Sequence, residues 1–184
     1  LLEAGGHVIV AGTERLAAHS NTVGRRADDD QAAAALKAVA DRSTARPGNV
    51  RNIAHRAADL PLDSLTRAWG DASVDEVIQY GEQAAVAQGL TLVDAPSRFE
   101  EAATALATAG ASVIIHVTAD GIPTGHPVVP VLKITGDRET ASALATDIDI
   151  DARTADVDDV IKRLAAVAGG DRTAAERHGL TKFA

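Results

Sequence analysis

Short apolar runs alternate with helix-like segments through the second half of the chain. Three such runs, Leu90–Asp94, Ser112–Thr118 and Val131–Thr135, are each followed by a cluster of turn-forming residues. Two alanine-rich segments with helical spacing are interleaved with them, and a fourth apolar run, Ile148–Ala152, follows. Strands that alternate with helices are typical of a parallel sheet whose two faces are covered. The pattern therefore predicts an α/β fold.

Further elements are predicted on both sides of this stretch. The apolar run His7–Ala11 indicates a strand, and Gln31–Arg42 indicates a helix because acidic residues precede its Ala/Leu interior and basic residues close it. Val74–Tyr80 fits either a short strand or a short helix. Residues 157–170 predict a last long helix, and the tail 171–184 predicts a short one whose first residue, an aspartate, is the cap.

Composition narrows the class of protein. Hydrophobic residues make up 46% of the 184 residues but aromatic residues only 2%, so Ala, Val, Leu and Ile must build the core. The net charge of −8 and the lack of a dense Lys/Arg cluster argue against a nucleic-acid surface. No apolar run reaches the length of a membrane span and no secretory signal pattern is present, so we expect a cytoplasmic protein. The lack of cysteine excludes disulfides and thiolate ligands within the chain.

The loop Thr118–Pro130 follows a predicted strand and is the first candidate for a binding site. Ligands of parallel sheets collect beyond the carboxyl ends of the strands. The loop combines two glycines, three prolines, two threonines, an aspartate and a histidine. Glycine permits close backbone approach and proline adds rigidity, so the loop can present amides and hydroxyls to an anion. A proline-rich surface crossover without a ligand explains the same composition equally well.

Two charged residues stand out in the apolar runs. Asp94 ends one run, shortly before Ser97, which is a good N-cap for a helix over Arg98–Ala109. Asp94 either hydrogen-bonds the loop at that helix start or binds a metal or a substrate hydroxyl. Lys133 interrupts an apolar strand, so on a covered strand it needs a partner or a lowered pKa and becomes a candidate base or carboxylate binder. On an edge strand it would simply be solvated.

Other acidic and phenolic groups are weaker candidates. Asp147, Asp149 and Asp151 alternate along the chain, so a strand would place them on one face, which either binds a cation or is solvated. Tyr80 and Glu82 follow a short element and either line a cleft or form a solvated turn. The histidines show no zinc-binding spacing, and no glycine-rich nucleotide motif or nucleophile elbow is present.

Several motifs then follow one another in a recognisable order. They are LLEAGGHVIVAGTERL (residues 1–16), Arg-Arg-Ala (25–27), Pro-Gly-Asn (47–49), VIQYGE (77–82), LTLVDAP (90–96), PTGHPVVPVLKITGDRETASALATDIDID (123–151) and the tail GDRTAAERHGLTKFA. In identity and order they resemble the carboxyl-terminal part of the altronate/galactarate dehydratase family, which also includes the sulfolactate sulfo-lyase large subunit. Each motif alone is weak, whereas their common order is specific.

The resemblance implies a Rossmann-like, three-layer αβα fold with a mostly parallel sheet, here a single domain over residues 1–184. It also implies a hydro-lyase that removes water from a sugar acid such as altronate or galactarate. A divalent metal is implied, typically Fe²⁺, with Mg²⁺, Mn²⁺ or Ca²⁺ as alternatives. Such chemistry needs a positive group on the substrate carboxylate, a base at the neighbouring carbon and an acid at the departing hydroxyl.

The resemblance and the residue chemistry together give a set of candidate site residues. They are Lys133, Asp94 and Tyr80 for catalysis, Asn49, Thr118, Thr124, Gly125 and His126 for substrate binding, and Glu82 and Asp149 for the metal. The chain opens like the last turn of a helix, so we expect an upstream domain or a separate subunit to complete the active site. We also expect a homo-oligomer.

The chain also departs from the family pattern. Gly12 and Ser20 stand where the family has acidic residues, Asp120 stands where it has a basic one, and a Gly-Gly-Leu-Thr-Thr block is absent after Asn49. These departures favour an alternative, a non-catalytic binding or assembly domain that keeps the fold. The retained PTG…PVLK run favours the lyase. Convergence of Asp94, Thr124 and Lys133 on one cleft would separate the two hypotheses.

Overall fold

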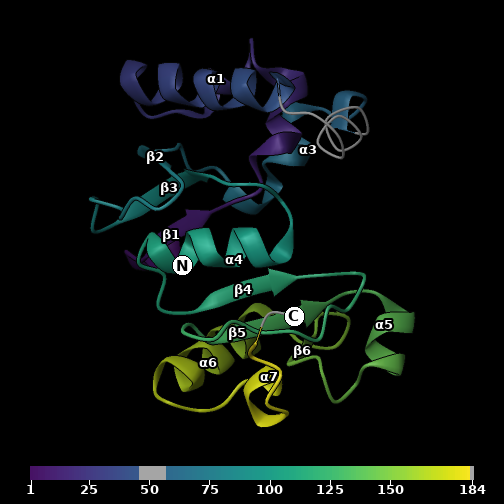
Figure 1. Cartoon of the computed structure of the whole chain (residues 1–184). Coiled ribbons are helices and arrows are strands. Elements are labelled where there is room, and N and C mark those ends of the chain that lie inside the picture. Colours follow the sequence, from purple (N-terminus) through teal and green to yellow (C-terminus); the bar gives the residue numbers. More distant parts are fainter. Residues whose placement is uncertain (46–56, 183–184) are drawn as a thin grey trace. The chain divides into compact units, whose positions relative to one another are not determined.

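The computed structural model describes residues 1–45 and 57–182, and these form two compact units, Leu1–Gly110 (unit 1) and Ala111–Ala184 (unit 2) (Figure 1). Each unit has its own sheet of three parallel strands with helices around it. The predicted α/β class with parallel strands is therefore confirmed. The strands expected in one sheet are divided between two, because an apolar run shows that a strand is buried but not which strand it pairs with. The single domain stays a prediction.

In unit 1 the strands β1 (His7–Val10), β2 (Glu76–Gln79) and β3 (Gly89–Asp94) lie in the order β1-β3-β2. The ambiguous segment 74–80 thus forms a strand. The register pairs Val10 with Leu92 and Gln79 with Asp94. All three strands therefore end at the same edge of the sheet, and the central strand β3 is buried along nearly its whole length.

Helices cover both faces of the unit 1 sheet. On one face Leu90 and Leu92 pack with Leu36 and Val39 of α1 (Asp30–Ala45). The same core includes residues of η2 (Thr13–His19), η3 (Val23–Arg26), α3 (Leu62–Leu65) and η4 (Arg67–Trp69). On the other face Val93 packs with Ala105 of α4 (Phe99–Thr108). Unit 1, which begins with η1 (Leu2–Ala4), is thus a three-layer αβα arrangement.

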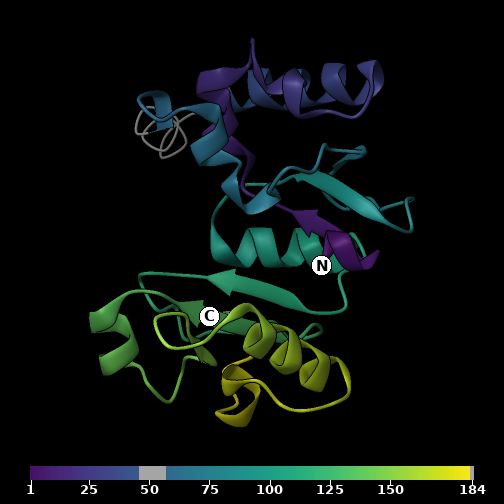
Figure 2. The same ribbon diagram turned by 180° about the vertical axis from the view of Figure 1, so that it is seen from behind.

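Unit 2 contains β4 (Ile114–Val117), β5 (Val131–Thr135) and β6 (Ile150–Asp151), in the order β4-β5-β6. Leu132 and Ile134 form its core with apolar residues of α6 (Val157–Ala168). The helices α5 (Arg138–Ala143) and α7 (Ala174–Arg177) complete the unit, and α7 lies next to α6 in both views (Figures 1 and 2). Within residues 1–45 and 57–182 no helix is long and apolar enough to cross a membrane.

Two predicted helix caps are wrong. The tail helix α7 begins at a capping box formed by Thr173 and Glu176, so Asp171 lies before the cap. A threonine followed three residues later by glutamate satisfies two backbone amides at once, which a lone aspartate does not. At the start of α4, Ser97 is not the N-cap, because its hydroxyl donates instead to the carboxylate of Glu14.

Candidate functional site

Polar side chains gather at the edge where the three strands of unit 1 end. Asp94, the last residue of β3, is only 5% exposed. Its Oδ1 accepts a hydrogen bond from Thr13 Oγ1 (3.2 Å), and its Oδ2 accepts from Nε and Nη2 of Arg42 (both 3.1 Å). Thr13 follows β1, and Arg42 lies in the last part of α1. The carboxylate therefore joins the ends of two strands and a helix through a buried, charge-assisted contact.

The guanidinium of Arg42 reaches a second strand end. Its Nη2 also lies 3.4 Å from Oε1 of Gln79, the last residue of β2, while the side chain remains 46% exposed. Arg42 was not among the predicted site residues, because in the sequence it is only a basic residue near the end of a helix. The sequence signal that could have indicated Arg42 was its position in the last turn of the helix between β1 and β2. A side chain at that position can reach the edge of the sheet.

A buried glutamate holds the neighbouring turn. Glu14 is 2% exposed, and its two oxygens accept from the backbone amide of Ser97 (2.8 Å) and from its hydroxyl (2.6 Å). Gly12 stands where the family has an acidic residue, whereas the buried acidic group at this edge is Glu14. Gly12 has φ +90°, and an added Cβ would lie 3.1 Å from Ser97 Oγ, so glycine fits the close approach of the two loops.

In unit 2 the central strand carries a fully buried lysine. Lys133 is 0% exposed, and its Nζ donates a hydrogen bond to the backbone oxygen of Pro123. Burial lowers the pKa of its amine, against the opposing effect of the Asp149 and Asp147 carboxylates. The expectation that a lysine on a covered strand has a partner or a lowered pKa is confirmed on both counts. Its role as a base stays a prediction, because Nζ lies beneath the loop.

The loop 118–130 is held by hydrogen bonds among its own polar groups and by bonds to neighbouring segments. Oγ1 of Thr118 accepts from the amides of Asp120 and Gly121 (both 3.1 Å). The Nδ1 atom of His126 accepts from the two amides that follow Pro127 (both 3.2 Å), and burial lowers the pKa of this imidazole. The amide of Gly125 donates to the backbone oxygen of Leu180 (2.6 Å), which ties the loop to the tail.

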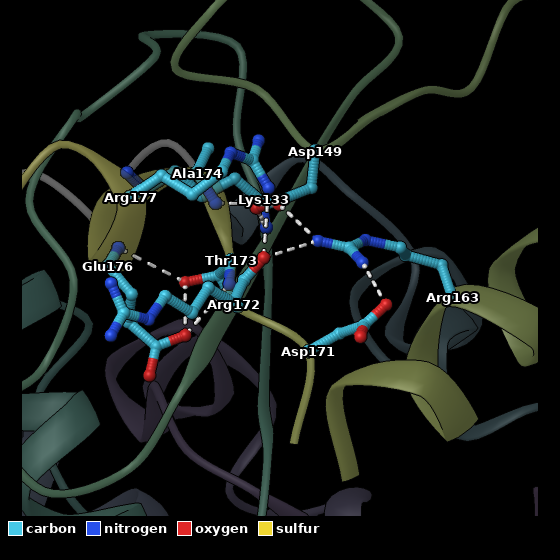
Figure 3. A network of polar contacts seen from close by, with 9 residues as sticks. All are labelled: Lys133, Asp149, Arg163, Asp171, Arg172, Thr173, Ala174, Glu176 and Arg177. Atoms are coloured by element: carbon cyan, nitrogen blue, oxygen red, sulfur yellow. Dashed lines mark hydrogen bonds and ion pairs between the residues drawn. The ribbon is translucent and has the colours of Figure 1, made fainter. Parts of the chain in front are cut away.

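The proposed metal ligands are engaged in other contacts. Oδ2 of Asp149 accepts from the Lys133 amide (3.0 Å), and Oδ1 accepts from the Ala174 amide (2.8 Å) and lies 3.4 Å from Arg163 Nη2 (Figure 3). Glu82 accepts from a backbone amide in its own turn. Within the described part of the chain, no group of three or more His, Asp or Glu side chains is placed to hold a metal. The described residues alone therefore do not form a site for the implied divalent metal, which stays a prediction.

The predicted site residues fall into three groups. Asp94, Tyr80 and Glu82 belong to unit 1, whereas Lys133, Asp149, Thr118, Thr124, Gly125 and His126 belong to unit 2. Asn49 lies outside the described residues. Within unit 2 the structure brings Lys133 and the proline-rich loop together, and Asp149 touches the backbone of Lys133. Tyr80 stands 48% exposed in the turn after β2. The catalytic and binding roles of these residues stay predictions.

Residues 64–184 match the family described as D-galactarate/Altronate dehydratase, C-terminal. The chain is 34% identical over 114 residues to altronate dehydratase of Bacillus subtilis (strain 168), and the aligned residues cover 62% of the chain and 22% of that relative. It is 35% identical over 106 residues to altronate dehydratase of Escherichia coli (strain K12), covering 58% and 21%. The chain thus spans about a fifth of the length of these relatives. Asp94 and Lys133 lie within the family match, and Glu14 and Arg42 precede it.

Proposed function

Because the chain belongs to the carboxyl-terminal family of the D-galactarate/altronate dehydratases, we propose that it forms part of a hydro-lyase that dehydrates a sugar acid. The observation that carries this proposal is the family match over residues 64–184, supported by two relatives that are altronate dehydratases. The substrate class is an aldonate or aldarate such as altronate or galactarate. We propose further that an upstream domain or a separate subunit completes the active site, and that the enzyme is homo-oligomeric and cytoplasmic.

The reaction begins at the carbon next to the substrate carboxylate. A base takes the proton from this carbon, the electron pair forms a carbon–carbon double bond, and the hydroxyl on the following carbon leaves as water after it receives a proton. The resulting enol then becomes a keto acid by taking a proton at the carbon that lost its hydroxyl and releasing the proton of the enol oxygen. The substrate therefore loses one water in total and ends as a 3-deoxy-2-keto acid.

Two parts of this chain bear on that reaction. The sheet edge of unit 1 offers Asp94 and Arg42 where ligands of parallel sheets collect. In unit 2, burial increases the neutral fraction of the Lys133 amine, and a neutral amine is able to accept a proton. Access of substrate to Lys133 requires that the Pro123 carbonyl releases Nζ. We assign the ligands of any divalent metal to residues beyond the described part of this chain.

A second candidate function is a binding or assembly domain without turnover. The burial of Lys133 favours it, because this amine is 0% exposed and bonds to the loop above it. The polar groups of Thr118, Gly125 and His126 also serve the shape of the loop. In this alternative the loop 118–130 is a rigid scaffold, and the chemistry resides in another domain or subunit.

Turnover by the full natural protein that contains this chain separates the two functions. The protein is incubated with galactarate, altronate and related sugar acids in the presence of Fe²⁺, Mg²⁺, Mn²⁺ or Ca²⁺, and keto acid is measured with a carbonyl reagent. Keto acid from at least one sugar acid supports the lyase. Loss of this activity in Lys133→Met, with an unchanged melting temperature, assigns chemistry to this chain. Sugar-acid binding without any keto acid supports the binding domain instead.

A further inference from the structure

Arg42 is fixed over the sheet edge of unit 1 by two neighbouring strand ends. Asp94 of β3 accepts from its Nε and Nη2, and Gln79 of β2 lies 3.4 Å from the same Nη2. The Asp94 side chain is only 4% exposed, so this pair is better anchored than a pair between two solvated side chains. The guanidinium plane is therefore held in one orientation before any ligand arrives, which lowers the entropy cost of binding.

The contacts of Arg42 leave one side of the guanidinium available. Among the described residues, Nη1 has no hydrogen-bond partner, and the side chain is 46% exposed. Gln79 is exposed, and its side chain carries an NH₂ donor group beside the oxygen that faces Arg42. Among the described residues, N–H donors thus lie without an acceptor at a point where two parallel strands end.

This arrangement fits a carboxylate better than a sugar hydroxyl. Nη1 can donate to a carboxylate oxygen, and a charge-assisted hydrogen bond of this kind is about twice as strong as a neutral one. Asp94 offsets part of the charge of Arg42, so binding depends more on direct hydrogen bonds than on long-range attraction. A ligand must therefore be small enough to reach the strand ends.

We infer that the sheet edge of unit 1 is a subsite for the carboxylate of a small hydroxy acid, with Arg42 as the anchoring residue and Gln79 beside it. This inference rests on the proposed function for the kind of acid. Dehydration next to a carboxylate needs a positive group on that carboxylate, and Arg42 supplies it. It does not follow from the family match, which begins at residue 64, after Arg42.

Calorimetric binding of galactarate to the full natural protein tests the subsite, with EDTA present to remove metal-dependent binding. Galactitol, which has the hydroxyls without the carboxylates, is the comparison ligand. Arg42→Lys keeps a positive charge beside Asp94 but has no second nitrogen in the place of Nη1, and we expect galactarate affinity to fall about 10- to 100-fold. The double variant Arg42→Gln/Asp94→Asn removes both charges of this pair and should lose affinity to a similar extent. Arg153→Gln, which breaks another arginine–aspartate pair, should leave affinity unchanged.

Wild-type protein that binds no galactarate, or binds galactitol equally well, would overturn the subsite. Unchanged galactarate affinity in Arg42→Lys with an intact melting curve would overturn it as well. The two proposals fail separately. Arg42-dependent binding without keto acid would leave the subsite standing and reject the lyase. Keto acid formed by Arg42→Lys with an unchanged KM would leave the lyase standing and reject the subsite.

Discussion

Replacing Asp149 with asparagine tests the network of polar contacts in unit 2 (Figure 3). The Asp149 side chain is 0% exposed and accepts from two backbone amides, those of Lys133 and Ala174, as well as pairing with Arg163. Asparagine keeps one acceptor oxygen, so its NH₂ group must face one of the two amides. A buried donor left without an acceptor costs about 1–3 kcal/mol, and the partly exposed Arg163 pair adds up to about 1 kcal/mol. We therefore expect the free energy of unfolding to fall by about 1–4 kcal/mol.

Urea unfolding of the full chain, followed by circular dichroism, measures this loss, and hydrogen exchange locates it. The amides of Lys133 and Ala174 should exchange faster in Asp149→Asn, whereas amides of β3 in unit 1 should not change. Asp151→Asn is the matched control, because Asp151 lies two residues away and pairs with Arg153 at the surface. We expect its free energy of unfolding to fall far less than that of Asp149→Asn, because this pair is partly exposed.

Two results would refute the reasoning. Equal unfolding midpoints for wild type and Asp149→Asn would show that the buried carboxylate adds nothing to the network. A loss of the same size in Asp151→Asn would show that the effect comes from the removal of charge and not from buried hydrogen bonds.

Two further predictions concern the loop 118–130. Gly125→Ala should destabilise unit 2 by about 1–3 kcal/mol in urea unfolding, because an added Cβ would lie 2.8 Å from Cβ of Ala175. Gly136→Ala, with open space around the added Cβ, should not destabilise the unit, and equal effects of the two variants would contradict this prediction. Burial lowers the pKa of His126, so the unfolded chain binds its proton first and stability should fall as pH drops below about 6.5; an unchanged slope of stability against pH in His126→Asn would count against it.

The strands could be predicted from the sequence because their apolar runs are short and bounded by turns. The run Val131–Thr135 matches β5 residue for residue, and Leu90–Asp94 misses only the first residue of β3. Their pairing could not be predicted, since a buried central strand carries no mark of its neighbours. The segment 74–80 was ambiguous for a related reason: a short amphipathic run fits both helical and strand periods, and packing decides between them.

The candidate site was predicted only in part. Lys133 was visible as a charge within an apolar strand, and its partner and lowered pKa agree with that interpretation. The alternation of Asp147, Asp149 and Asp151 predicted that a strand would place them on one face, yet β6 includes only Ile150–Asp151. Asp149 instead faces the interior of the unit, where it accepts from the backbone amide of Lys133. Arg42 and Glu14 escaped notice, because tertiary contacts across more than 50 and 80 positions of the chain give them their roles.

Proton exchange during turnover tests the central claim most directly. The full natural protein is incubated with galactarate or altronate and a divalent metal in D₂O, and the product is followed by NMR. Dehydration through an enol predicts a 3-deoxy-2-keto acid in which the new CH₂ carbon carries one deuterium, because solvent supplies the proton that completes the keto acid. A sugar acid that is bound yet remains unchanged and unlabelled under every metal would contradict the account.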